Sequence, residues 1–279
     1  MGGVRRPRLM FILIAPVLAL VALAVMVRWI EPRVAFFPFR GESVTPRDFG
    51  VAFDALTVET EDGERLRAWA MRASDPRAFV VYFHGNGGNL SNWAPILTGI
   101  VRQGYSVFAF DYRGFGLSTG RPTEHGLYRD VDAVLARAWP DRDSRISLVY
   151  WGRSLGGAMA GYAATVRAPD GVIVESAFPD ARSVVRGSPL ALVWFLSTYR
   201  FPTADFLNRA GVPVLQLHGD RDSVIPFALG RELHERLTVQ KQFFVIRGGD
   251  HNDAAPPDPA AYWAAIDAFV KSLGPAGRR

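Results

Sequence analysis

The chain has no cysteine among its 279 residues. Disulfides, a thiol nucleophile and a cysteine-bound zinc site are therefore excluded, and redox chemistry cannot indicate the cellular compartment. The chain also lacks the phosphate-binding patterns GxxxxGKS/T and GxGxxG. A Gly-rich segment at residues 84–89 follows neither pattern and has no lysine nearby. We expect no metal and no organic cofactor.

The sequence also has no strong excess of charge of one sign. It contains 32 Lys and Arg residues and 27 Asp and Glu residues, which gives a formal net charge of +5. The basic residues are scattered along the chain, apart from a cluster of Arg5, Arg6 and Arg8. Scattered charge does not form the continuous basic surface by which proteins hold nucleic acid. We therefore expect no nucleic acid partner and interpret the cluster as the flank of a membrane segment.

Charged and polar side chains are absent from residues 9–27. As a helix these 19 residues would span about 28 Å, close to the roughly 30 Å of a bilayer core. We therefore predict one transmembrane helix within residues 1–30. A cleaved signal peptide is the alternative, since Ala22-Leu23-Ala24 offers a small-x-small cleavage site. However, the run exceeds the usual apolar region of about 7 to 15 residues in such peptides.

The arginines that flank this run predict its orientation. By the positive-inside rule the cluster before residue 9 stays in the cytoplasm, which places the part of the chain after the run on the extracytoplasmic side. Arg28, Arg33 and Arg40 follow the run and weaken that asymmetry. Residues 31–50 are rich in proline and phenylalanine, and we expect them to form an extended linker with an apolar patch that lies on the membrane surface or on the domain.

Residues 51–274 have the pattern of one domain of the α/β class. Short apolar runs, typical of parallel strands covered on both faces, alternate with segments of helical spacing. At the start of the domain, Asp62-Gly63 favours a tight antiparallel hairpin. The pattern predicts a doubly wound, mostly parallel sheet of eight strands that opens with this hairpin. Strands are expected at residues 51–60, 65–71, 78–83, 105–110, 146–151, 171–174, 212–217 and 242–246, and helices at about 90–103, 123–138 and 155–166.

Residues 177–208 interrupt this alternation of strands and helices. The segment contains three prolines and an aromatic cluster, and it is too long for a simple connection. We interpret it as a small lid over the site, and we expect Trp194, Phe195 and Phe201 to bind the substrate. Such a lid favours a small-molecule or lipid-like substrate with a hydrophobic acyl group of short to medium length.

One stretch joins a strand to a helix through Gly-x-Ser-x-Gly. Gly152-Arg153-Ser154-Leu155-Gly156 follows the strand expected at 146–151 and opens the helix expected at 155–166. A serine in so sharp a turn presents its hydroxyl outward, and the glycines let the neighbouring backbone pass closely. This context favours a nucleophile elbow over an ordinary Gly- and Ser-rich loop. Ser154 is therefore the candidate nucleophile.

Candidates for an acid and a base follow in the chain order Ser, Asp, His. Asp220 and Asp222 lie in the loop after the strand at 212–217, and either carboxylate could orient a histidine or merely cap the turn. His251 comes after the strand at 242–246 and completes the order. The remaining histidines are weaker candidates, because they precede the functional turns or belong to helices: His84, His218, His125 and His234.

Five motifs in order, HGNGGN, DYRGFGLSTG, GRSLGG, HGDRDSVIP and GGDHND, resemble those of the α/β-hydrolase superfamily and in particular its Bem46-like group. The resemblance covers almost the whole chain after about residue 50. It implies Ser154 as nucleophile, Asp222 as acid and His251 as base, with the backbone N–H groups of Asn86 and Leu155 as the oxyanion hole. Members of the group often have a single amino-terminal membrane helix.

The resemblance implies a membrane-anchored serine hydrolase that cleaves acyl ester or thioester bonds through an acyl-enzyme on Ser154. Relatives are often labelled serine aminopeptidases, so hydrolysis of an amide by the same residues is an alternative. A binding protein that kept the fold and lost catalysis is a third interpretation. Asp250 is a departure from the Gly that is frequent in related sequences, and it would add a negative charge beside His251.

Overall fold

The computed structural model describes residues 6–187, 191, 195 and 197–274. Its central feature is an eight-stranded sheet with the strand order β10-β9-β8-β7-β4-β6-β3-β2. The six strands from β10 to β6 run parallel, whereas β3 is antiparallel to β6 and β2 is antiparallel to β3. The strands are β2 (Asp54–Glu59), β3 (Arg65–Met71), β4 (Phe79–Phe83), β6 (Ser106–Phe110), β7 (Leu148–Arg153), β8 (Gly171–Glu175), β9 (Val214–Gly219) and β10 (Lys241–Ile246). The predicted sheet and its opening hairpin are confirmed.

Helices cover both faces of this sheet, so its central strands β4, β6, β7 and β8 are buried along their whole length. One apolar core includes side chains of α3 (Glu124–Arg137), α4 (Leu155–Val166), α6 (Thr203–Ala210) and α7 (Phe227–Arg236). The other core includes side chains of α2 (Leu90–Arg102) and α8 (Pro259–Ser272). The helix predicted at 123–138 begins as expected, because the Thr123 hydroxyl accepts a hydrogen bond from the Gly126 N–H at 3.0 Å.

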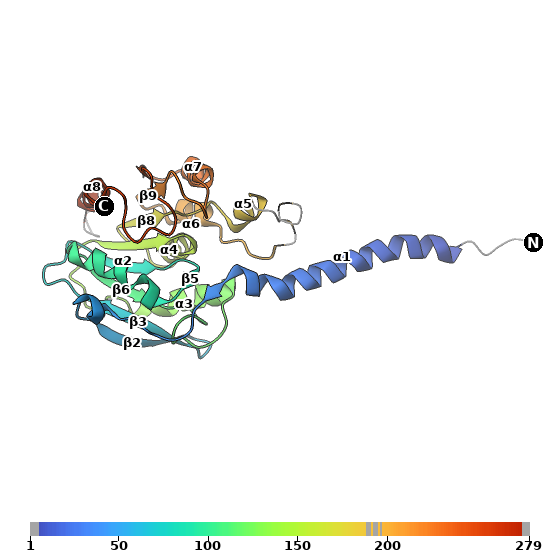
Figure 1. The fold of residues 1–279 in the computed structure, drawn as a ribbon, viewed down its shortest axis with the longest axis horizontal. Helices are drawn as coiled ribbons and strands as arrows, with labels where there is room; N and C mark the ends of the chain where they lie inside the picture. Colours follow the sequence, from blue (N-terminus) through green and yellow to red (C-terminus); the bar gives the residue numbers. More distant parts are fainter. Residues whose placement is uncertain (1–5, 188–190, 192–194, 196, 275–279) are drawn as a thin grey trace, which may run out of the picture.

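Helix α1 (Arg6–Ala35) extends away from the domain, as Figure 1 shows. It contains the apolar run at residues 9–27 and ends five residues after the boundary predicted at residue 30. Within the part of the chain that the structure describes, no helix is both long enough and apolar enough to cross a membrane. The membrane helix therefore stays a prediction.

The segment at residues 31–50 is more ordered than the extended linker that we expected. The last turn of α1 occupies its start, β1 (Phe37–Pro38) pairs in parallel with β5 (Gly87–Gly88), and a 3₁₀ helix, η1, covers Pro46–Phe49. Phe36 is only 3% exposed and belongs to the first apolar core. The apolar patch thus lies on the domain, one of the two positions that we expected, whereas the short helical pieces at both ends of the segment were not expected. We call residues 35–41 the connector.

The predicted lid at residues 177–208 is shorter in the structure, and we use the term lid insert for the part of it that precedes α6 (Thr203–Ala210). It contains a short helix, α5 (Ala181–Arg186), but its predicted end overlaps α6, which packs on α4. The packing is close, because a Cβ on Gly161 of α4 would lie 3.2 Å from the Cβ of Phe206. Since α6 buries Phe206 and Leu207, it belongs to the layer that covers the sheet rather than to the lid.

Candidate active site

Ser154 lies at the turn between β7 and α4, with backbone angles φ 56° and ψ −121°. Such angles are rarely adopted by a residue with a side chain, and they persist only where the surroundings impose them. A Cβ on Gly152 would overlap the carbonyl oxygen of Gly156, and a Cβ on Gly156 would overlap that of Phe83. Both positions therefore require glycine. The local structure is the strand, turn and helix that the sequence predicts.

His251 and Asp222 are joined by a hydrogen bond. The Nδ1 of His251 lies 2.9 Å from Oδ2 of Asp222, in the loop that follows β9. The other carboxylate oxygen accepts the backbone N–H groups of Val224 and Ile225 at 3.0 and 2.7 Å. Burial raises the pKa of Asp222, but the hydrogen bonds from His251 and Ile225 outweigh it and lower the pKa overall. An ionised Asp222 accepts the Nδ1 proton, which leaves Nε2 of His251 as the acceptor.

Asp220 has a different role from Asp222. Its Oδ1 accepts the N–H of Gly248 at 2.6 Å, and Asp250 accepts the N–H of Ser223 at 2.7 Å. Hydrogen bonds from the side chain and the backbone of Ser223 lower the pKa of Asp250. The two carboxylates thus join the loop of Asp222 to the loop of His251. The structure brings Asp222, and not Asp220, into contact with His251.

Two further histidines lie behind the loops. His84 is 1% exposed, and its Nδ1 lies 2.7 Å from the carbonyl oxygen of Gly85. Burial lowers the pKa of His84 to about 4, so the ring is neutral at pH 7 and donates its Nδ1 proton to that carbonyl. His218 is fully buried, and its Nε2 lies 2.9 Å from the oxygen of Ile225. Both side chains support the turns that they precede.

Arg153 is a residue of the site that sequence reasoning missed. The guanidinium is buried, and its Nη2 donates to the carbonyl oxygens of His251 at 2.6 Å and Asp253 at 3.0 Å. A cation next to the nucleophile thus fixes the loop that carries the histidine. A charged residue at the end of an otherwise apolar strand was the available signal, because such a charge is rarely buried without partners.

A cavity of about 920 Å³ brings the predicted residues together. Ser154, His251, Asn86 and Leu155 all line it. Its size is near the upper end of the range of about 300–1,000 Å³ that is usual for small-molecule sites. The remaining wall is mainly apolar and comes from α1, the connector, the lid insert and the loop after Asp222. It includes Val27, Ile30, Phe36, Phe37, Val184 and Tyr199.

The three aromatic residues predicted to bind substrate have different positions. Phe201 is 4% exposed and lines the cavity. Phe195 is 52% exposed and is not among the described residues of the cavity wall. Trp194 lies outside the described residues. Phe36 of the connector packs edge-on against Phe201 and Tyr199, with ring centroids 6.3 and 5.4 Å apart. The aromatic wall is therefore shared between the lid insert and the amino-terminal segment.

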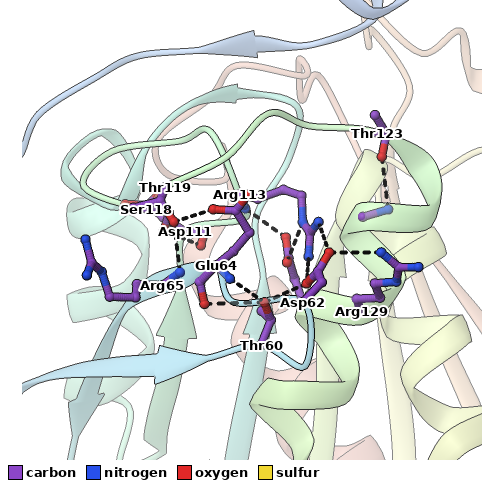
Figure 2. A network of polar contacts seen from close by, with 12 residues as sticks. Thr60, Asp62, Glu64, Arg65, Asp111, Arg113, Ser118, Thr119, Thr123 and Arg129 are labelled. Atoms are coloured by element: carbon purple, nitrogen blue, oxygen red, sulfur yellow. Dashed lines mark hydrogen bonds and ion pairs between the residues drawn. The ribbon is translucent and has the colours of Figure 1, made fainter.

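The loop at residues 111–120 carries the DYRGFGLSTG motif and is held by a polar network, which Figure 2 shows. Arg113 donates to both carboxylate oxygens of Asp62 at 2.9 and 3.0 Å and to Asp130 at 2.8 Å. Thr119 accepts the N–H of Arg65 at 2.9 Å. The motif thus ties the loop to the β2–β3 hairpin and to α3.

Groups of three or more His, Asp or Glu residues that could hold a metal ion were not found in the described part of the chain.

Comparison with known proteins gives the family. A family model described as "Serine aminopeptidase, S33" matches residues 74–208. The protein YNL320W of Saccharomyces cerevisiae, named as a membrane protein, is 34% identical over 239 residues, which cover 82% of this chain and 84% of that protein. The chain belongs to the α/β-hydrolase superfamily. This α/β-hydrolase is also 31% identical to Rv2307c of Mycobacterium tuberculosis over 277 residues, which cover 94% of this chain and 97% of that protein.

Solved structures share the fold of this α/β-hydrolase. An esterase of Pyrococcus furiosus, Pf2001, superposes with a TM-score of 0.69 at 20% sequence identity and covers 86% of this chain and 98% of its own. An esterase of Rhodococcus, RhEst1, superposes with a TM-score of 0.59 at 19% identity and covers 79% of this chain and 99% of its own. At these identities the likeness concerns the fold alone.

Proposed function

We propose that this α/β-hydrolase cleaves acyl ester or thioester bonds, with Ser154 as nucleophile, His251 as base and Asp222 as acid. The main support is the 2.9 Å hydrogen bond between His251 and Asp222, together with the cavity that both His251 and Ser154 line. The strained elbow and the shared cavity support Ser154 as the third member. The esterase names of two proteins with this fold agree with the proposal.

The proposed reaction follows from these positions. The Ser154 hydroxyl attacks the carbonyl carbon and transfers its proton to Nε2 of His251, while the negative oxygen of the tetrahedral intermediate accepts the N–H groups of Asn86 and Leu155. His251 then gives the proton to the departing alcohol or thiol, and an acyl group remains on Ser154. Water, deprotonated by His251, attacks the acyl carbon, and the acid product leaves as Ser154 regains its proton.

Hydrolysis of an amide is the alternative, and the name of the matching family model favours it. An aminopeptidase would need a free carboxylate for the substrate amino group. Two carboxylates line the cavity, and both accept hydrogen bonds from the protein: Glu31 accepts the Ser197 hydroxyl at 2.5 Å and the Thr198 N–H at 2.9 Å, and Asp253 accepts the Asp250 N–H at 2.8 Å. The apolar wall therefore favours an acyl group over a charged amine.

Labelling with a fluorophosphonate probe tests the reaction type. The unaltered chain is expected to form a covalent adduct at Ser154, and Ser154→Ala should abolish it. A binding protein that has lost catalysis would not react with the probe. Rates on matched ester, thioester and peptide substrates then separate acyl hydrolysis from peptide hydrolysis, since a higher kcat/KM on the peptide would favour the alternative.

We also propose that α1 anchors the protein in a membrane, with the catalytic domain on the extracytoplasmic side. Apolar side chains of α1 are more than half exposed in the isolated chain, among them Val17, Leu18 and Val25 at 59%, 61% and 61%. Contiguous exposed apolar surface of this kind marks a site of contact with protein or lipid. The yeast relative is named as a membrane protein, which agrees with the proposal.

Membrane fractionation tests the anchor. The full chain is expected to remain with membranes in carbonate and in high salt, whereas a chain that begins at residue 31 should be released. Mature protein whose first residue lies near Val25 would instead establish a cleaved signal peptide. Protease protection of the carboxyl terminus reports the side of the membrane on which the domain lies.

The cavity wall predicts a preference for hydrophobic acyl groups. Each CH₂ that it buries contributes about 0.8 kcal/mol, which is about fourfold in kcat/KM when the energy is expressed in the transition state. The gain extends to longer chains than the lid alone implies, because α1 and the connector supply a second apolar wall. A series of p-nitrophenyl esters from acetate to palmitate measures this slope.

Two exposed phenylalanines provide a matched pair for that series. Phe37 is 57% exposed and lines the cavity, whereas Phe195 is 52% exposed and lies outside the cavity wall. We expect Phe37→Ala to reduce the gain per methylene and Phe195→Ala to leave it unchanged. Equal slopes in both variants would remove the connector from the specificity of the site.

A further inference from the structure

We propose that the connector, residues 35–41, is a positioning element of the active site that holds the loop at residues 85–89 in its catalytic geometry. The inference rests on the proposed function, because the loop matters for catalysis only if the Asn86 N–H stabilises the oxyanion. The connector lies before the predicted catalytic domain, and none of the motifs of the sequence includes it.

The connector binds this loop through both backbone and side-chain groups. The N–H of Phe37 donates to the oxygen of Asn86 at 3.3 Å, and the N–H of Phe39 donates to the oxygen of Gly88 at 3.0 Å. The side-chain amide of Asn86 donates to the oxygen of Ala35 at 2.5 Å. A two-stranded parallel ladder between β1 and β5 results.

These contacts fix Asn86 from both sides. The peptide before Asn86 carries the proposed oxyanion donor, and its carbonyl, that of Gly85, accepts the Nδ1 proton of His84 at 2.7 Å. The peptide after Asn86 is fixed by the N–H of Phe37. Because a trans peptide is planar and its N–H and C=O point in opposite directions, the bond from His84 sets the direction of the Asn86 N–H. By holding the next carbonyl, the connector restrains the rotation of Asn86 about its own backbone bonds.

On its other side the connector is fastened to the loop at residues 111–120. The N–H of Gly41 donates to the oxygen of Gly116 at 3.1 Å, and the N–H of Gly116 donates to the oxygen of Phe39 at 2.8 Å. Arg40 donates to the carbonyl oxygens of Ser118 and Gly120 at 2.8 and 3.2 Å. The connector therefore bridges a loop that the polar network braces and the loop that carries the oxyanion donor.

A Gly-rich loop needs such a partner. Glycine has the largest conformational freedom of any residue, so residues 85–88 contain few side chains that could fix the backbone. Oxyanion donors act only when they are held in place before the reaction, since they must meet an oxygen that becomes charged in the transition state. A loop freed from the connector would bind the substrate but stabilise the transition state less.

Asn89→Ser separates this role from the stability of the fold. Asn89 caps α2 by accepting the N–H of Ser91 at 3.0 Å, and its Nδ2 donates to the oxygens of Phe39 and Gly41 at 3.2 and 2.8 Å. Serine caps a helix about as well as asparagine and is also uncharged. It cannot supply the two bonds to the connector. Asn86→Ala is a second variant, which keeps the backbone N–H and loses the bond to Ala35.

The matched control is Asp48→Asn, which removes the carboxylate that accepts the Thr45 N–H and hydroxyl in η1. Asp48 follows the connector in the chain, and its side chain accepts hydrogen bonds from Thr45 and not from the loop at residues 85–89. We therefore expect this variant to keep the kcat, the KM and the Tm of the unaltered chain.

The test uses the full chain in detergent, with p-nitrophenyl butyrate and an alkylboronic acid that forms a tetrahedral adduct on the serine. For Asn89→Ser and Asn86→Ala we expect a fall in kcat of about tenfold or more per titrated active site, with KM changed less than about twofold, because the loss of a positioned donor acts on the transition state. The boronate inhibition constant should rise by the same factor as kcat/KM falls. Amide hydrogen exchange at residues 85–89 should become faster.

The outcomes separate this inference from the proposed function. Unchanged kcat and unchanged exchange at residues 85–89 in both variants would overturn the role of the connector. A loss of Tm with an unchanged kcat per active site would also overturn it, since the connector would then be only structural. If the unaltered chain neither hydrolyses the ester nor reacts with a fluorophosphonate, the proposed function is rejected. The exchange measurement then decides alone whether the connector holds the loop.

Discussion

The nucleophile elbow and the loop at residues 85–89 line the same cavity, but different forces hold them. The elbow is fixed by steric contacts, because a Cβ on Gly152 would overlap the carbonyl oxygen of Gly156 and a Cβ on Gly156 would overlap that of Phe83 in the adjacent strand β4. The loop is joined by hydrogen bonds to the connector, almost fifty residues earlier in the chain, and it also contacts α2, where the Nε1 of Trp93 donates to the oxygen of Gly87 at 3.1 Å. A Cβ on Gly87 would meet no atom within 4 Å. Tight packing therefore determines one half of the site and long-range backbone pairing determines the other.

This difference predicts how each half responds to mutation. Steric contacts within a local motif are sensitive to the size of single side chains, because protein interiors are packed as densely as organic crystals. Backbone pairing tolerates changes of side-chain size but depends on the presence of the partner segment. Variants on the two sides can therefore distinguish the two mechanisms.

The largest effect is expected for the proposed acid, Asp222, which acts together with Ser154 of the elbow. Asp222→Asn should lower kcat by about 10⁴-fold, since a neutral amide no longer holds the correct tautomer of the base. Asp220→Asn is the matched control, because its carboxylate accepts the Gly248 N–H and does not contact His251. Esterase kinetics on both purified variants, with Tm measured in parallel, make the comparison. Reversed effects of the two variants would mean that the acid is assigned to the wrong aspartate.

The second prediction compares two glycines. Gly156→Ala should reduce the free energy of unfolding by about 3 kcal/mol or more, because the new methyl group meets the backbone of β4, which cannot yield as a side chain would. Gly87→Ala should change it by less than about 0.5 kcal/mol, because the position is exposed, its contacts are made by the backbone and the new methyl group meets no atom within 4 Å. Denaturant unfolding followed by near-ultraviolet circular dichroism measures both. Similar losses in the two variants would show that the elbow is not sterically determined.

Much of the elbow side could be predicted from the sequence, because its signals are local. The apolar runs predicted the eight strands to within a few residues, and the glycines around Ser154 predicted the turn that the structure contains. The choice between Asp220 and Asp222 needed a resemblance to other proteins. Two carboxylates two residues apart in one loop give no local signal of which one meets a histidine 29 residues later.

The connector side could not be predicted, for a physical reason. A two-residue strand has no periodicity, and the pairing of Phe37 with Gly87 spans 50 residues through backbone groups that every residue has. Its prolines and phenylalanines suggested an extended linker with an apolar patch on the membrane surface or the domain, but they did not identify the partners of Phe36, which packs among the aromatic residues of the lid insert. The lid boundary failed in a similar way, since α6 is recognised only once its partner α4 is in place.

The smallest effect is expected for substitution of Asp62, which belongs to the polar network in Figure 2 and contacts the connector only indirectly. Hydrogen bonds from Arg113, and then Thr60, hold the pKa of Asp62 far below its usual range. A carboxyl with a lowered pKa in the folded state stabilises the protein above its unfolded pKa of about 3.9, and this stability is lost as the pH falls. Asp62→Asn should therefore cost on the order of 1 kcal/mol at pH 7, given that the pair is partly solvated. The cost should shrink steadily below about pH 5, where the carboxylate of the unaltered chain loses its advantage.

Asp143→Asn is the control for that titration, because Asp143 also binds an arginine, Arg145 at 2.7 Å, but the pair lies at the surface and outside the network. Arg145 holds the pKa of Asp143 at about 2, yet exposed pairs contribute little to stability, so no change in unfolding is expected. For Asp62→Asn the fall in kcat should remain smaller than for Asn89→Ser, since Asp62 reaches the loop at residues 85–89 indirectly, through Arg113 and the loop at residues 111–120. Equal losses of kcat in Asp62→Asn and Asn89→Ser would show that the polar network of Figure 2 and the connector act as one rigid unit. The β2–β3 hairpin would then also belong to the elements that hold the loop at residues 85–89.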